Sequence, residues 1–377
     1  MKPTLPSYIK IVVILIGITL AVFLMIEAKS LLVPILISGL LAVLISPFTS
    51  WLEKNKFPRY LAVSLSLIAL LVLIGLLLFF FYNQVLSFAK DISFLERRTT
   101  ELINEINALI EKYSDAAIPL SMSQMKDVVF EYITENMSSL TRGKMATAST
   151  LTMLFIIPVY IYLFLYYRHF LISFLLKAFG ENNHDRVNNA VHKIRQVIKN
   201  YVKGMFLVII ILAILNTATL YAFGIKHALL FGVFAAMLNV IPFLGPILGS
   251  ALPIVYALLT KDSLWYPVGI LISFYVIQLF ESNLFTPKIV GGKVSMNPLM
   301  TIFALFIGNF IWGLAGMILF IPGLAILKVV FDEIPGMEPY GYLLGNVNEE
   351  KKEKRRRIVE EKIKQVSAKI KKAGRKS

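Results

Sequence analysis

Long stretches that contain no charged residue cover more than half of this 377-residue chain. A helix of about 20 apolar residues spans the hydrocarbon core of a membrane, which is about 30 Å thick. Charged residues make up only 16% of the chain, compared with about 25% in soluble domains. These features exclude a soluble enzyme and a secreted domain, and they predict an all-α polytopic membrane protein with about eight membrane segments. The uncharged runs are residues 11–26, 30–52, 60–89, 145–167, 204–225, 228–260, 263–280 and 294–327.

The sequence lacks the motifs of several common chemistries. It has no cysteine, which removes disulfides, thiolate metal sites and cysteine nucleophiles. Its four histidines form no HExxH zinc motif, and no GxxxxGK[ST] loop is present to bind a nucleotide phosphate. We therefore expect no enzyme activity, no metal and no cofactor. Any uphill transport must then draw on an ion gradient or a partner.

Basic residues in the loops predict the orientation of the chain, because short cytoplasmic loops are enriched in lysine and arginine. Two lysines precede the first run, and the loop at 53–59 holds three basic residues. Residues 168–203 carry a net charge of +5, and residues 349–377 a net charge of +8. We expect all these segments, and both termini, in the cytoplasm. No small-x-small cleavage pattern follows the first run, so we expect a retained span.

The pattern of runs and loops predicts five parts. Residues 1–89 form the first three membrane helices. Residues 90–144 contain two apolar stripes at helical spacing, which predict an extracytoplasmic helical hairpin; a packing or oligomer contact is favoured there over a binding domain. Residues 145–200 comprise the fourth span and an amphipathic cytoplasmic interfacial helix. Residues 201–335 are the transport core with broken membrane segments, and residues 336–377 are a basic cytoplasmic tail, expected to contact anionic lipid rather than nucleic acid.

Two runs in the core are too long for one membrane helix and short for two. Residues 228–260 contain Pro242, Gly245 and Pro246, and residues 294–327 contain glycines and Pro322. Proline removes a backbone donor and clashes with the preceding turn. Interrupted apolar segments in corresponding halves of a chain point to a transporter site. We expect two re-entrant helical hairpins with residues 263–287 crossing between them; two long kinked spans are the alternative.

Two motifs follow in the same region. The first is Asn-Val-Ile-Pro-Phe-Leu-Gly-Pro at 239–246, and the second is Glu-Ser-Asn-Leu-Phe-Thr-Pro-Lys-Ile-Val-Gly at 281–291. Together they resemble the autoinducer-2 exporter family of bacterial membrane proteins, over about residues 11–330. The resemblance implies an inner-membrane homo-oligomer that transports small polar solutes, including a signalling furanone in some members and sodium–proton exchange in others.

Polar residues and helix breaks in the core supply the candidate site. Glu281 is the only acid between Ser263 and Thr301, and an intramembrane carboxylate is a functional candidate by default. The alternative is a position at the end of a span, or a pair with Lys288. For the neutral candidates, the alternatives are helix capping, helix packing and interhelical hydrogen bonding. The candidate substrate- or ion-binding residues are Glu281, Asn283, Asn239, Thr286, Pro242, Gly245, Pro246, Gln278 and Asn216.

Three hypotheses for function follow. The first is a secondary transporter, an exporter or permease of a small polar or anionic organic solute, with its site between the two broken segments and a proton or sodium gradient as driving force. The second is a sodium/proton antiporter without an organic substrate. The third is a non-transporting membrane scaffold, which predicts no flux at all.

Overall fold

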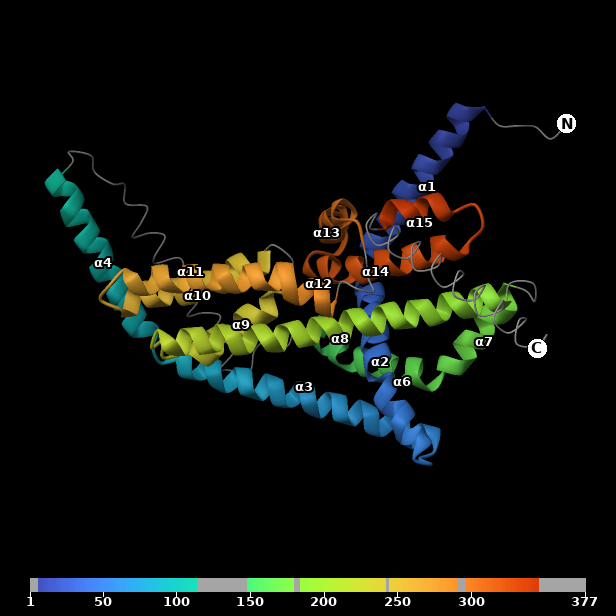
Figure 1. Cartoon of the computed structure of the whole chain (residues 1–377), viewed down its shortest axis with the longest axis horizontal. Helices are drawn as coiled ribbons and strands as arrows, with labels where there is room; N and C mark the ends of the chain where they lie inside the picture. Colours follow the sequence, from blue (N-terminus) through green and yellow to red (C-terminus); the bar gives the residue numbers. More distant parts are fainter. Residues whose placement is uncertain (1–5, 114–147, 180–183, 242–243, 291–295, 346–377) are drawn as a thin grey trace, which may run out of the picture. The chain divides into compact units, whose positions relative to one another are not determined.

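The computed structural model describes residues 6–113, 148–179, 184–241, 244–290 and 296–345 (Figure 1). Within these ranges the regular elements are helices, apart from one isolated β-bridge between Met296 and Gly345. Six of the described helices are long and apolar enough to cross a membrane, or seven when the bent pair α6–α7 is counted as one. The prediction of an all-α polytopic membrane protein is confirmed.

The described part of the chain contains fourteen α-helices and one π-helical turn. They are α1 (Ser7–Glu27), α2 (Lys29–Lys54), α3 (Arg59–Ala89), α4 (Ile92–Tyr113), α6 (Ala148–Tyr166), α7 (Arg168–Ala178), α8 (His184–Ala222), α9 (Ala228–Leu238), α10 (Leu244–Thr260), α11 (Trp265–Phe280), the π-helical turn η2 (Glu281–Phe285), α12 (Thr286–Ile289), α13 (Pro298–Trp312), α14 (Leu314–Glu333) and α15 (Glu338–Leu344). The interfacial helix predicted at the end of residues 145–200 and the fifth span are one continuous helix, α8. The second arm of the predicted outer hairpin and the tail at 349–377 lie outside the described residues.

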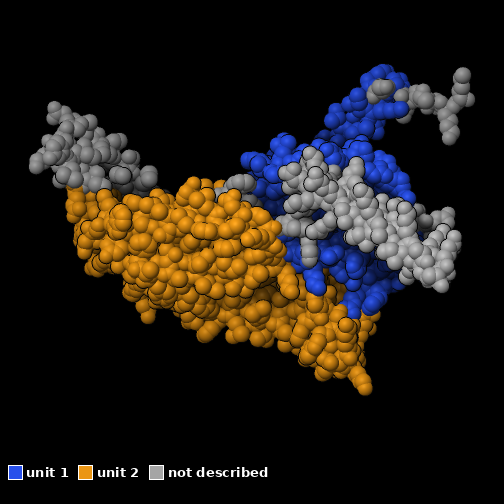
Figure 2. Space-filling view, viewed as in Figure 1, with its two compact units in different colours: residues 1–36, 167–202, 290–377 blue, residues 37–166, 203–289 orange. Residues whose placement is uncertain are grey.

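The chain divides into two compact units (Figure 2). The first contains residues 1–36, 167–202 and 290–377, and the second contains residues 37–166 and 203–289. In the first unit, α13 and α14 form a hairpin around Gly313, whose φ of 62° suits glycine. Gly308 and Gly316 bring the two backbones into direct contact. The run 294–327 is therefore broken, as predicted, although α14 alone is long enough to cross a membrane. That this hairpin enters the membrane and returns to the same side stays a prediction.

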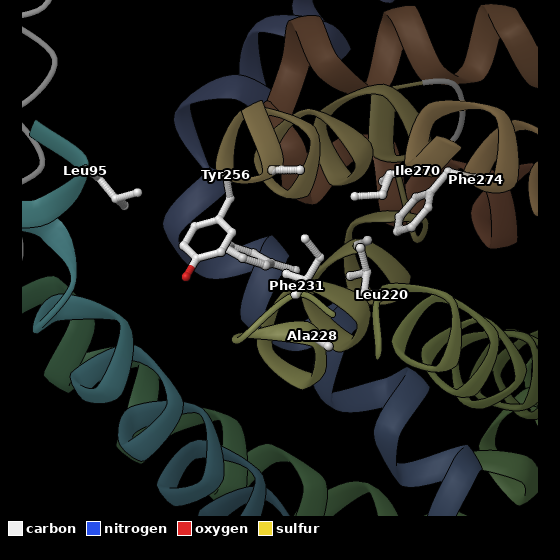
Figure 3. Packing of buried hydrophobic residues seen from close by; sticks show 10 residues of the cluster. Leu95, Leu220, Ala228, Phe231, Tyr256, Ile270 and Phe274 are labelled. Carbon is white, nitrogen blue, oxygen red and sulfur yellow. The ribbon is translucent and has the colours of Figure 1, made fainter. Parts of the chain in front are cut away.

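The second unit holds two buried apolar clusters. One joins α2, α3 and α6, and the small side chain of Ala42 allows close helix packing there. The other joins α4, α8, α9, α10 and α11 through large side chains that include Leu220, Phe231 and Phe274 (Figure 3). Within it, α9 and α10 pack side by side as a hairpin, and Gly249 lies against Ala235. The run 228–260 is thus also two helices, which end and begin around the Pro242 motif.

Candidate functional site

A cavity of about 270 Å³ lies among α8, α9, α10 and α11 in the second unit. Its polar lining comes from Asn216, Asn239, Ser250, Tyr275 and Gln278. The rest of the lining is apolar, and none of the described lining residues is charged. A mostly apolar cavity with a few converging polar groups is typical of a small-molecule site.

Helix geometry explains why these side chains converge. Leu271, Tyr275 and Gln278 are spaced four and three residues apart, so they share one face of α11. Asn216 is buried on α8. Asn239 is the C-cap of α9, and its backbone N–H donates to the carbonyl of Ala235. The end of α9 therefore places Asn239 at the cavity wall.

Glu281 is buried directly behind this wall, with 8% of its surface exposed. It begins the π-helical turn η2, a feature that often occurs at functional sites. Gln278 Nε2 donates a hydrogen bond to Glu281 Oε2 at 2.7 Å, and Thr286 Oγ1 donates to Oε1. Gln278 also lines the cavity, so one amide connects the carboxylate to the cavity. Among the described ion pairs, none joins Glu281 to Lys288.

The predicted site residues fall into distinct positions. Asn216, Asn239, Pro246 and Gln278 line the cavity, and Glu281 and Thr286 form the hydrogen-bonded group behind it. Gly245 lies at the contact between α10 and the end of α9. The exposed Asn283 amide donates to the carbonyl of Leu279 and does not line the cavity. Pro242 lies outside the described residues. A role in transport stays a prediction for all of them.

A second polar group in the same unit was not predicted from the sequence. It consists of Asp91, Lys226 and His227, which we call the Asp91 clamp. Lys226 Nζ lies 2.8 Å from both carboxylate oxygens of Asp91, and His227 Nε2 lies 2.8 Å from Oδ2. No local spacing connects residue 91 with residues 226 and 227, so only the fold brings them together. The sequence signal that could have drawn attention to this group is Asp91 itself, an acid that follows directly after the long apolar run 60–89.

The charge of Asp91 is stabilised by the clamp. Burial acts to raise the pKa of Asp91, but hydrogen bonds from Lys226 and His227 and the charge of Lys226 outweigh it. The pKa of this carboxyl therefore lies below its ordinary value of 3.8. Because the folded state holds the charged form, Asp91 stabilises the fold above that ordinary value, and the stabilisation is lost as the pH falls through the lowered pKa.

A stability difference between the wild type and Asp91→Asn measures this effect. We expect the wild type to unfold at a higher temperature, by an amount that stays constant from neutral pH down to about pH 5. The difference should shrink as the pH falls below 3.8. Thermal unfolding of the purified protein in detergent at stepped pH values gives the comparison. A difference that is already lost by about pH 6 contradicts the lowered pKa.

Comparison with known proteins shows the family to which this chain belongs. A model of the family described as "AI-2E family transporter" matches residues 10–336 of the chain. The chain belongs to the AI-2E transporter family. It is therefore a multi-span membrane protein of a transporter family, and the resemblance seen in the sequence is confirmed.

Two bacterial transport proteins are similar to this chain over most of its length. The Bacillus subtilis (strain 168) protein named "Putative transport protein YrrI" is 24% identical over 315 residues, which cover 80% of this chain and 86% of the relative. "AI-2 transport protein TqsA" of Escherichia coli (strain K12) is 22% identical over 327 residues, covering 86% and 92% of the two chains. In this AI-2E transporter, the first of the two sequence motifs lies at the α9–α10 break, and the second begins with η2 and continues into α12.

Proposed function

We propose that this AI-2E transporter is a secondary transporter that exports a small polar or anionic organic solute and uses a proton or sodium gradient. The site is the cavity among α8, α9, α10 and α11. Glu281 binds the coupling ion. A contribution of the second broken segment, α13–α14 of the first unit, stays a prediction from the sequence.

The observation that supports this proposal best is the hydrogen-bonded chain from the cavity to Glu281. Gln278 faces the cavity and donates to the carboxylate, and Thr286 donates to its other oxygen. Protonation of Glu281 would change which hydrogen bonds Gln278 can make to a solute, because a protonated carboxyl can donate a hydrogen bond as well as accept one. Occupancy of the cavity and protonation of Glu281 are thereby coupled, as gradient-driven transport requires.

The lining narrows the choice of solute. Amide and hydroxyl groups can donate and accept hydrogen bonds, which suits a solute with several hydroxyl or carbonyl groups. The described lining has no positive charge to balance an anion, so an uncharged polar solute fits better than an anionic one. The relative TqsA carries AI-2 in its name, and AI-2 is therefore the first compound to test.

A sodium/proton antiporter is the second candidate, and the burial of Glu281 favours it. A carboxylate with neutral oxygen ligands nearby is a suitable site for either a proton or a sodium ion. The two functions differ in whether an organic solute is required. In the antiporter, sodium flux proceeds without any added solute.

Flux through purified protein in liposomes tests the proposal. We expect AI-2 uptake or release that responds to an imposed pH or sodium gradient, with a matched arm that follows sodium alone. Sodium flux without solute supports the antiporter instead. Absence of flux for both probes under either gradient removes AI-2 as the solute and the antiporter as a function, and it favours a membrane scaffold.

A pair of asparagine variants tests the position of the site. We expect Asn239→Ala to raise the half-saturating solute concentration about tenfold, because a lost hydrogen bond to a buried solute costs about 1–2 kcal/mol. Asn283→Ala is the matched control, since its amide bonds to Leu279 away from the cavity. Equal losses in both variants, measured in the same liposome assay, would place the site elsewhere.

A further inference from the structure

The Asp91 clamp connects two places in the second unit, the junction of α3 with α4 and the beginning of α9. Asp91 lies between the last residue of α3 and the first residue of α4, and Lys226 and His227 lie directly before α9. The His227 side chain is 3% exposed and that of Asp91 17%, so this ion pair is largely withdrawn from water. The Lys226 side chain is 64% exposed and pairs with the same carboxylate. The clamp therefore fixes the beginning of α9 to the α3–α4 junction.

A group of aromatic rings packs against the clamp. His227 contacts Phe88 of α3, Phe231 of α9 and Tyr256 of α10, with ring centroids 5.4, 6.3 and 5.6 Å apart. Phe231 and Tyr256 also contact one another at 5.2 Å. The three contacts of the His227 ring are edge-to-face, and such contacts add to the stabilisation that comes from burial. The clamp thus holds together a compact layer formed by α3, α9 and α10.

This aromatic layer continues into the wall of the solute cavity. Phe231 and Tyr256 belong to the same buried cluster as Ala235 and Phe274 (Figure 3), and both Ala235 and Phe274 line the cavity. Helix α3 begins after the basic loop that is predicted to be cytoplasmic, so its far end, with Asp91, is predicted to be extracytoplasmic. The layer then lies between the cavity and the outer solution.

We propose that the Asp91 clamp and the rings of Phe88, Phe231 and Tyr256 form the extracytoplasmic gate of the transport cavity. This inference rests on the proposed function. Asp91 and His227 act as positioning residues: they hold α9 and α10 against α3 and keep the aromatic layer closed. Outward access to the cavity requires this layer to separate. Loss of the clamp therefore shifts the protein toward an outward-open state.

Labelling of a single cysteine tests the gate without a known solute. The natural chain has no cysteine, and Ser250 on α10 lines the cavity, so Ser250→Cys introduces one reactive position there. A membrane-impermeant maleimide is applied from the outer side of cells, and the labelling rate is compared with and without Asp91→Asn. We expect the second substitution to raise the rate about tenfold, because a hydrogen bond to a charged group is lost.

Two further variants separate gating from a general loss of structure. Asp91→Glu keeps the charge and should return the rate toward that of Ser250→Cys alone. Asp262→Asn removes an exposed acid that is not part of the clamp, and it should leave the rate unchanged. If Asp91→Asn does not fold, Lys226→Met replaces it, since Lys226 is mostly exposed; it too should raise the rate.

The outcomes distinguish the gate from the proposed function. Faster outer labelling in Asp91→Asn, reversed in Asp91→Glu, supports the gate. Equal labelling rates with and without the clamp overturn the gate, while a water-accessible cavity and the proposed function remain. No labelling of Ser250→Cys from either side, in any variant, overturns both, because the cavity is then closed to water.

Discussion

Glu281→Gln is expected to abolish gradient-driven flux. The substitution keeps the size of the side chain, and its amide can still bond to Gln278 and Thr286, which hold Glu281 in place. Among the described residues that line the cavity or bond to its lining, it removes the one carboxylate, which can bind and release a proton or carry a negative charge for sodium. We expect the flux that responds to a pH or sodium gradient to fall about 100-fold, to the level of empty liposomes. Proteoliposome flux under each gradient measures it.

The control for this variant is the same change at an exposed acid. Glu338 lies at the beginning of α15, where its carboxylate accepts from the Gly336 amide, and Glu338→Gln should leave flux unchanged. Thermal unfolding in detergent shows whether Glu281→Gln still folds. Wild-type flux in a folded Glu281→Gln protein would remove Glu281 from the coupling mechanism.

Gly245→Ala is expected to disrupt the α9–α10 hairpin. A Cβ atom at Gly245 would overlap the backbone carbonyl of Leu238, and backbone cannot move aside as a flexible side chain can. Overpacking of this kind costs about 1–3 kcal/mol. Because Asn239 and Pro246 flank this contact, the separation of the two helices would also open the cavity wall. We expect a lower unfolding temperature together with loss of flux.

Gly75→Ala provides the matched comparison. Gly75 lies in α3 of the same unit, and a Cβ atom there meets nothing within 4 Å. This variant should unfold at the wild-type temperature or slightly above it, since alanine favours a helix more than glycine does. Equal unfolding temperatures for Gly245→Ala and the wild type would show that the hairpin is looser than described.

Much of the fold could be predicted because membrane helices leave a strong signal in the sequence. The uncharged runs correspond to α1, α2, α3, α8 and α11, and the breaks in the two longest runs follow from proline and glycine positions. The length of α14 could not be predicted. Gly313 breaks its run near the middle, but apolar residues and Lys328 continue the helix to Glu333, so one arm of that hairpin is long enough to cross a membrane.

The candidate site was only partly accessible to sequence reasoning. Asn216, Asn239 and Gln278 were recognisable as polar residues in apolar runs, and the fold brings them to one cavity. Asn283 was expected beside them, but the π-helical turn changes the direction of successive side chains and leaves it bonded to Leu279. No sequence pattern predicts such a turn. The Asp91 clamp depends on a contact across 136 positions, which helix periodicity cannot reveal.

A high-resolution structure in a lipid nanodisc tests most directly whether the cavity among α8, α9, α10 and α11 serves a polar solute. The proposed transport site predicts ordered water, or bound solute, hydrogen-bonded to the side chains of Asn216, Asn239 and Gln278. A lipid acyl chain in that space, or side chains packed across it without water, would contradict the proposal.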